Sequence, residues 1–275
     1  MSQLAPFTDL AAFEALDSAQ RQALGEPLAE SLGKEFSALP TLVGSKGMVA
    51  VEHVPSGVQL VAVPGGSFEM GLTADDEDAI RACVDYDAAG IQSRLQDFDA
   101  QCSPVHTVEV SPFLLSIIHL TPEQLQRLTA GLLQFDVLSA DDTMTFAARV
   151  PALRLPSEAE LEYAGREGGA VSFVNDGGRV WAQTRQWPEA SAWGLQRMWF
   201  AAWAADEWHE NYHGAPPTSR VWSDRGKPGV YRGCLLYAPE TEEELIYGLA
   251  ACRGRLALPD DEWDVLVRAA CSIAV

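Results

Sequence analysis

A helix-start signal and a helix-stop signal stand close together between Arg154 and Gly169, in the string Arg-Leu-Pro-Ser-Glu-Ala-Glu-Leu-Glu-Tyr-Ala-Gly-Arg-Glu-Gly-Gly. Pro156 disfavours helical backbone at the residue before it. Ser157 and Glu160 have the spacing of a capping box, in which each side chain accepts a hydrogen bond from the other residue's backbone N–H. The two glycines that close the string can end a helix, because glycine adopts the left-handed conformation without steric cost. The sequence therefore predicts a helix that begins directly after Ser157.

The same string resembles the Arg-Leu-Pro-Thr-Glu-Ala-Glu-Trp-Glu-Tyr-Ala-Ala-Arg segment of the formylglycine-generating enzyme family (sulfatase-modifying factor domains). It differs from that segment only by Ser for Thr, Leu for Trp and Gly for Ala. Other stretches resemble family motifs in the same order, and they include the strand ending Pro-Gly-Gly-Ser-Phe-Glu-Met-Gly71, the helix start Thr121-Pro-Glu-Gln124 and the segment Gly229-Val-Tyr-Arg-Gly233. The resemblance implies an α+β, irregular C-type-lectin-like fold with small antiparallel sheets, two main helices and long loops.

The resemblance covers roughly residues 55–275 and predicts one domain there. Residues 1–54 are expected to form a helical N-terminal extension and a first strand, with two short helices over residues 8–38. A Pro-Ser-Gly turn at residues 55–57, between runs that alternate with a period of two, predicts a hairpin. We expect residues 73–103 to be an acidic insertion on the surface, and Asn175-Asp-Gly-Gly178 to be a turn between short strands.

The site motifs of the family are altered in this chain. In the family, an Asn and a Glu of the segment Gly-Asn-Val-Trp-Glu-Trp help to hold calcium, but here Ala201 and Ala204 offer no side-chain oxygen. In formylglycine-generating enzymes a cysteine pair that can bind Cu(I) follows the Arg-Gly motif. Here Arg232-Gly233 is followed by Cys234, Tyr237 and a run of carboxylates. The scaffold motifs are therefore retained, whereas the positions that would bind metal or perform chemistry are substituted.

Charge and composition narrow the classes of partner. The formal net charge of −20 argues against nucleic acid and against anionic membrane surfaces, since both attract basic proteins. No leader-like N-terminus or long apolar segment is present in the sequence, so a cytoplasmic location is the default expectation. The five cysteines are an odd number without regular spacing, and they imply no disulfide framework.

Two patterns raise the question of a metal site. His209-Glu-Asn-Tyr-His213 fits the zinc-hydrolase pattern, in which two histidines one helical turn apart bind the metal. The Gly-Ala-Pro-Pro sequence that follows would end such a helix at once, and no third ligand is indicated. Cys234 and Cys252 are the weak thiolate candidates, although a free cysteine is more often a small buried hydrophobe. No cofactor is predicted, and the sequence leaves copper, iron, zinc and calcium open.

Aromatic residues are concentrated in the C-terminal half, where seven of the eight tryptophans lie between Trp181 and Trp222. This density favours a binding face, because exposed aromatic side chains are common in ligand and partner surfaces. The candidate binding residues are Trp199, Trp203, Trp208, Tyr212, Arg232, Cys234 and Tyr237.

The sequence thus favours a non-catalytic binding or accessory protein for a protein partner or small ligand. Two alternatives remain open. One is a copper- or non-haem-iron-dependent oxidoreductase of the same family with a relocated site, and the other is a zinc hydrolase through His209, Glu210 and His213. The oligomeric state is not indicated.

Overall fold

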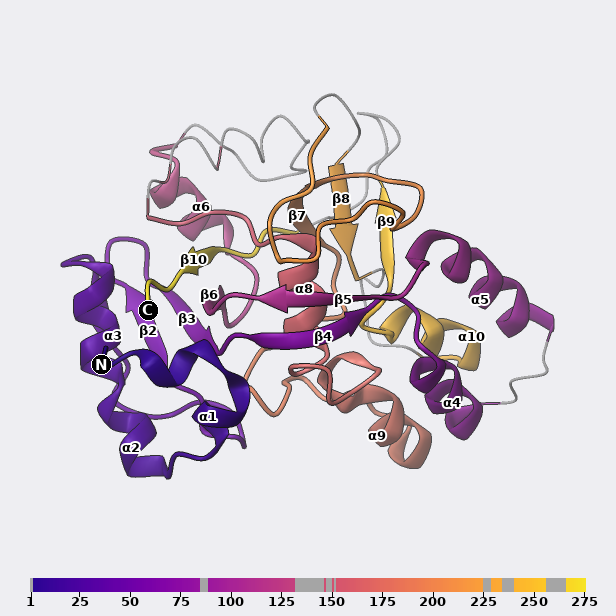
Figure 1. The fold of residues 1–275 in the computed structure, drawn as a ribbon, viewed down its shortest axis with the longest axis horizontal. Helices are drawn as coiled ribbons and strands as arrows, with labels where there is room; N and C mark the ends of the chain where they lie inside the picture. The colour runs from indigo at the N-terminus through magenta and orange to yellow at the C-terminus, as the bar shows by residue number, and fades with distance from the viewer. Residues whose placement is uncertain are drawn as a thin grey trace.

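Three small antiparallel sheets and a set of short helices make up the fold, which is of the α+β class (Figure 1). The structure is a computed structural model, and it describes residues 2–84, 89–131, 146, 150, 152–224, 229–233, 240–255 and 266–275. The helices are η1 (Ala5–Thr8), α1 (Leu10–Glu14), α2 (Ser18–Ala23), α3 (Gly25–Leu32), α4 (Ala74–Cys83), α5 (Ala89–Cys102), α6 (Pro122–Leu128), α8 (Glu158–Gly165), η2 (Val174–Asp176), α9 (Gly177–Thr184), α10 (Glu242–Leu245) and η3 (Ile246–Gly248).

The largest sheet joins both ends of the chain. Its strand order is β1-β2-β3-β6-β10, with β1 (Phe36–Ala38), β2 (Ala50–His53), β3 (Val58–Val63), β6 (Phe113–Ser116) and β10 (Ala270–Ser272), and all its pairs are antiparallel. The predicted hairpin is confirmed, since β2 and β3 pair across a turn with His53 opposite Val58. The domain boundary expected at residue 54 falls inside this hairpin and stays a prediction.

Two smaller sheets lie beside the central helix. Strands β4 (Gly66–Met70) and β5 (His106–Val110) form one pair, and β7 (Ala202–Glu207), β8 (Gly229–Arg232) and β9 (Arg253–Arg255) form a three-stranded sheet in that order. Helix α8 packs against β4, β5, β7 and β8, so it connects the two sheets (Figure 1).

Helix α8 confirms the strongest local prediction. It begins directly after Ser157, whose side chain accepts from the backbone N–H of Glu160, while the Glu160 carboxylate accepts from the N–H of Ser157. All eight of its residues are buried, including the three glutamates. Buried carboxylates need partners that balance their charge. The partners of the α8 glutamates define the candidate site.

Two expectations about individual elements were wrong. The N-terminal segment forms three α-helices, and the residues near Phe36 form a strand paired with β2 instead of a helix face. The Asn-Asp-Gly-Gly segment lies in η2 and at the start of α9 instead of forming a turn between strands, and Gly177 packs on Trp187, where an added Cβ would lie 2.2 Å from the ring. The acidic insertion forms α4 and α5, and its Asp76 is fully buried.

Within the part of the chain that the structure describes, no helix has the length and apolar character needed to cross a bilayer.

Candidate functional site

A network of buried ion pairs lies between α8 and the β7–β9 sheet. Glu158 accepts from two arginines: Arg232 Nη1 donates to its Oε1 at 2.9 Å, and Arg253 Nη2 donates to its Oε2 at 3.1 Å. Arg232 also pairs through Nη2 with Glu162, one helical turn further along. The Tyr212 hydroxyl donates to Glu158 at 3.0 Å, so the strand arginines and the helix glutamates form one connected group.

The network continues to the acidic insertion through Arg166. Its Nε donates to Glu162 Oε1 at 2.9 Å, and its two terminal nitrogens donate to the two carboxylate oxygens of Asp76 at 2.8 Å each. Arg166 also donates to the Gly71 carbonyl at 2.7 Å. Helix α4 is therefore fixed to helix α8 by a buried bidentate pair, which is among the strongest kinds of side-chain contact.

Neighbouring opposite charges set the protonation states of Glu158 and Arg232. Burial alone would raise the pKa of Glu158, but the positive charges of Arg253 and Arg232 outweigh it and hold that pKa below its ordinary value. Burial likewise opposes the charge on Arg232, yet Glu162, Tyr212 and Glu158 hold its pKa well above the usual value. Glu158 and Arg232 therefore stay ionised and paired with each other at neutral pH.

Asp206, on β7, differs from its neighbours because no arginine compensates it in the described residues. Its Oδ2 accepts from the backbone N–H of Glu158 at 2.7 Å, and its Oδ1 accepts from the N–H of Trp222 at 2.8 Å. Burial and then the nearby Glu158 charge raise the pKa of Asp206 to about 7, against the lowering effect of the two N–H groups. Asp206 thus ties the start of α8 to the segment that carries Trp222.

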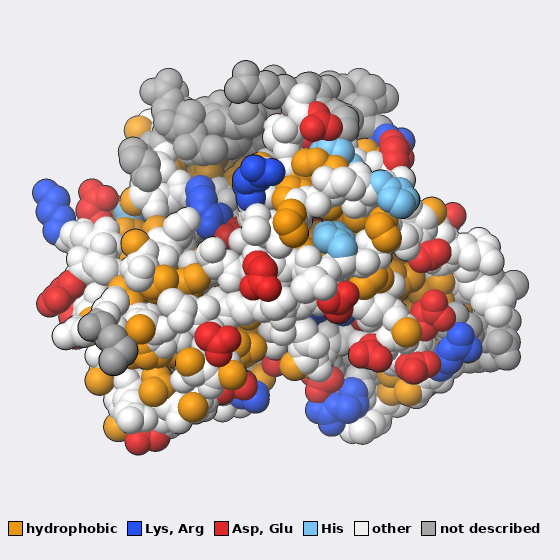
Figure 2. Space-filling view, viewed as in Figure 1, with side chains coloured by type: hydrophobic (Ala, Val, Ile, Leu, Met, Phe, Trp, Pro, Cys, Tyr) orange, Lys and Arg blue, Asp and Glu red, His pale blue; other side chains and the backbone are white. Residues whose placement is uncertain are grey.

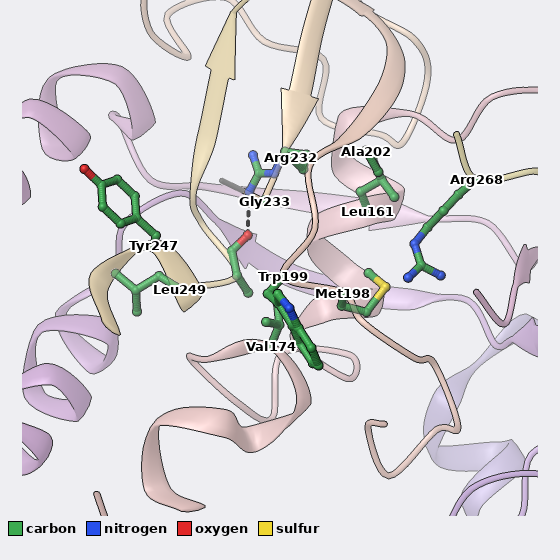
Figure 3. A pocket seen from close by; sticks show the side chains of 11 residues that line it. Leu161, Val174, Met198, Trp199, Ala202, Arg232, Gly233, Tyr247, Leu249 and Arg268 are labelled. Atoms are coloured by element: carbon green, nitrogen blue, oxygen red, sulfur yellow. Dashed lines mark hydrogen bonds between the residues drawn. The ribbon is translucent and has the colours of Figure 1, made fainter. Parts of the chain in front are cut away.

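A narrow cavity lies on one side of this network, near the end of β8 (Figure 3). Its volume is about 10 Å³, which is room for about one water molecule. We refer to it as the Arg268 cavity; its lining is mainly apolar, with Met198, Trp199, Leu161 and Leu249 beside the two arginines Arg232 and Arg268.

A wider and more open hollow, of about 320 Å³, lies at the turn after β7. We call it the aromatic recess, and its lining consists of Trp208, His209, Glu210, Asn211, His213, Trp222 and Arg255. The imidazole of His209 stacks on the Trp222 ring with centroids 3.5 Å apart, and it is held in place by the Glu207 carbonyl at 2.9 Å and Asp224 Oδ2 at 3.0 Å. In Figure 2, histidine side chains gather among hydrophobic ones on this part of the surface, with acidic groups around them.

One wall of the aromatic recess carries an exposed ion pair. Arg255 Nη1 lies 3.0 Å from Glu210 Oε1, and the Arg255 guanidinium carbon lies 5.7 Å from the centre of the Trp208 ring. Both charged side chains are about half exposed or more. This wall therefore offers a carboxylate and an aromatic face that already accept a guanidinium from the same chain.

The structure places the predicted binding residues in the interior. Trp199, Trp203 and Trp208 are 3%, 1% and 4% exposed, and Tyr212 is 3% exposed, so the expectation that they form an exposed aromatic face is corrected. The rings pack in the core because their strand and loop segments turn inward toward α8; only Trp208 also borders the aromatic recess. Arg232 is part of the buried network, and Cys234 and Tyr237 lie outside the described residues.

The predicted metal ligands form no metal-binding group among the described residues, although His209 and His213 both line the aromatic recess. His209 and His213 follow β7 in bends and turns instead of a helix, with the first buried and paired to Asp224 and the second exposed. Cys252 is buried at the start of β9 and Cys234 is not described. Among the described residues there is no group of three or more His, Cys, Asp and Glu side chains suited to a metal ion.

Sequence reasoning missed Asp76, Arg253, Arg255 and Arg268. Only Asp76 had a local signal, since Thr73 and Asp76 have capping-box spacing and do form that cap at the start of α4. The arginines carry no pattern of their own, because their partners lie far away in the sequence.

Comparisons with known proteins support the fold alone. No family model matches the sequence, and no curated protein is significantly similar to it. Among the solved structures that are similar, PvdO from Pseudomonas aeruginosa has a TM-score of 0.57 and 20% identity over 82% of this chain and 98% of that one. Treponema denticola variable protein 1 has a TM-score of 0.54 and 13% identity, over 79% and 97% of the two chains.

Proposed function

We propose that this chain is a non-catalytic binding protein on a formylglycine-generating-enzyme-like, C-type-lectin-like scaffold. Its site is the aromatic recess, and its partner is a protein segment that presents an arginine side chain. The observation that carries the proposal is the pair of Arg255 with Glu210 beside Trp208, in which the recess holds a guanidinium of its own chain.

The recess suits exchange of that guanidinium for another one. An exposed ion pair contributes about 0–1 kcal/mol, so displacing Arg255 from Glu210 costs little. An incoming arginine would gain the same carboxylate and could also stack against the platform of His209 and Trp222, which lies in the same recess.

The rest of the molecule favours a basic partner. The formal charge of −20 attracts basic segments over a long range and repels acidic ones. Beneath the recess, the buried Arg253 donates to the His209 carbonyl at 3.0 Å and its guanidinium carbon lies 4.3 Å from the centre of the Trp208 ring, which fixes the floor of the recess to the buried network. A rigid site loses less conformational entropy on binding.

The test uses a synthetic nonapeptide with three spaced arginines, and a matched peptide with citrulline at those positions. Binding to the wild type is compared with two variants of equal net charge, Glu210→Lys in the recess and Glu77→Lys on α4. The proposal predicts that Glu210→Lys weakens binding of the arginine peptide roughly tenfold, the size of one charge-assisted contact, whereas Glu77→Lys has a much smaller effect. Equal weakening by both variants would reduce the interaction to net charge and contradict the proposal; tight binding of the citrulline peptide would point to a different ligand class.

A further inference from the structure

The side chain of His53 is buried at the end of β2, and one of its ring nitrogens has no hydrogen-bond partner among the described residues. The side chain is 6% exposed, and the ring packs against Phe36 with the ring centres 5.1 Å apart. Nδ1 lies 2.8 Å from the Ser56 hydroxyl oxygen. Nε2 lies 3.8 Å from Glu35 Oε2, which is beyond hydrogen-bond distance. The imidazole is thus fixed in place, with its second nitrogen unused beside a carboxylate.

The hydrogen bonds of Ser56 make this second nitrogen an acceptor. The Ser56 hydroxyl donates to the His53 carbonyl at 3.3 Å, and with its proton directed there, the contact of Ser56 with the ring has Nδ1 as the donor. A neutral imidazole that carries its proton on Nδ1 has a lone pair on Nε2. Burial lowers the pKa of His53, against the raising effect of Glu35, so the ring is neutral at neutral pH. Nε2 and the Glu35 carboxylate are therefore two acceptors side by side, an arrangement that suits a ligand with several N–H donors.

A hollow of about 450 Å³ lies beside these two acceptors. We call it the hairpin hollow, because it adjoins the turn between β2 and β3. Its polar lining residues are Glu35, His53, Ser56 and Arg127, and its apolar ones are Pro55, Leu128, Val150 and Ala152. Sites for small molecules have volumes of roughly 300–1,000 Å³ and combine an apolar lining with a few polar groups. The hairpin hollow has the size and the mixed lining of such a site.

Arg127, on helix α6, brings a positive charge to the same hollow. Its Nη1 donates to the Ser56 carbonyl at 3.4 Å, and Gln124 of the same helix donates to the Gly57 carbonyl at 3.0 Å. These two bonds fix α6 to the hairpin turn. A guanidinium has several more N–H donors in a planar fork that fits a carboxylate. One hollow therefore presents an anion with a neutral acceptor, a cation and an apolar surface.

We propose that the hairpin hollow binds a free α-amino acid with an apolar side chain. Its ammonium group donates to Glu35 and to His53 Nε2, and its carboxylate pairs with Arg127. Its side chain contacts the apolar part of the lining, which includes Leu128. A simple amine would leave Arg127 without a carboxylate, and a simple carboxylate would leave the two acceptors without a donor. This site is separate from the aromatic recess and does not depend on the proposed function.

The test measures binding of three probes by isothermal titration calorimetry. The probes are L-leucine, isoamylamine, which is leucine without the carboxylate, and isocaproate, which is leucine without the ammonium group. The expected result is saturable binding of leucine that is roughly tenfold tighter or more than the binding of either analogue, the size of one charge-assisted contact. No saturable binding of leucine to the wild type, or equal binding of leucine and one of its analogues, would overturn the proposal.

Two variants locate the site. Glu35→Gln and Arg127→Gln each remove one charge from the hollow, and both side chains reach the surface, so the variants should fold. Each should weaken leucine binding roughly tenfold. Glu77→Gln and Arg81→Gln make the same charge changes on α4 and should leave the affinity unchanged. An affinity that is the same in the hollow variants as in these controls would place leucine elsewhere and contradict the assignment.

Discussion

Asp76 and Arg166 form a bidentate ion pair that is closed to solvent. Both Oδ–Nη distances are 2.8 Å, and the side chains are 0% and 4% exposed. The two residues are 90 positions apart, so this contact fixes the insertion helix α4 to the central helix α8. The acidic insertion is thereby part of the folded core of the molecule.

Replacement of Asp76 by Asn should therefore be strongly destabilising. The change leaves Arg166 buried with one carboxylate, Glu162, where it had two, and the loss of one partner of a buried pair costs about 3–5 kcal/mol. Urea unfolding monitored by tryptophan fluorescence measures the free energy of unfolding. Glu77→Gln, one residue away in the same exposed turn of α4, serves as the control and should change stability by about 0.5 kcal/mol or less. Similar effects of the two changes would contradict the assigned role of the pair.

The buried Asp206 should give stability a specific pH dependence. Its pKa is raised from 3.8 to about 7 in the folded state, so between these values the folded protein binds a proton that the unfolded chain does not. The contribution of Asp206 to stability is thus fully present below about pH 4 and is lost as pH rises through about 7. The stability lost is at most about 1.4 kcal/mol for each unit by which the folded and unfolded pKa values differ.

The comparison with Asp206→Asn isolates that contribution. The large negative charge of the whole chain gives the stability of both proteins nearly the same pH dependence, so this effect cancels in the difference. The free energy of unfolding of the wild type, minus that of the variant, should decrease steadily from pH 4 to pH 7. A difference that does not change over this range would show that Asp206 titrates normally.

The protein should not convert the cysteine of a sulfatase-type peptide to formylglycine. The family's cysteine pair is absent from the sequence that follows Arg232-Gly233, and Arg232 itself is held by Glu158 and Glu162. Mass spectrometry of such a peptide after incubation with copper and oxygen should show no aldehyde product, and a clear mass loss matching the aldehyde would overturn this expectation. Metal analysis of the purified protein complements the test, since stoichiometric copper or iron would favour an oxidoreductase and zinc a hydrolase.

Local signals in the sequence predicted local structure well. The capping boxes at Ser157 and Thr121 form as expected, and so does the hairpin turn at residues 55–57. In each case the residues that determine the structure lie within four positions of one another, so the pattern is complete in a short window. The α+β class followed from such elements together with the family resemblance.

The candidate site was much less accessible to sequence reasoning. Part of the tryptophan-rich stretch was predicted to form a binding face, but composition does not reveal which side of a strand or loop packs on α8. The pairs of Glu158 with Arg232 and Arg253 join residues 74 and 95 positions apart, which no local pattern can reveal. Gly177 was assigned to a turn because glycine is common there, whereas here its missing side chain makes room for Trp187.

We propose that Arg255 occupies the position that a partner's arginine takes on binding. Its most direct test is the affinity of Arg255→Ala for the three-arginine peptide, measured beside Arg81→Ala, which makes the same charge change on α4. If the internal guanidinium competes with the peptide, Arg255→Ala will bind it more tightly than both the wild type and Arg81→Ala, because the Glu210 carboxylate is then free of its internal partner. Weaker binding by Arg255→Ala, or a gain equal to that of Arg81→Ala, would contradict the assignment of the aromatic recess as the binding site.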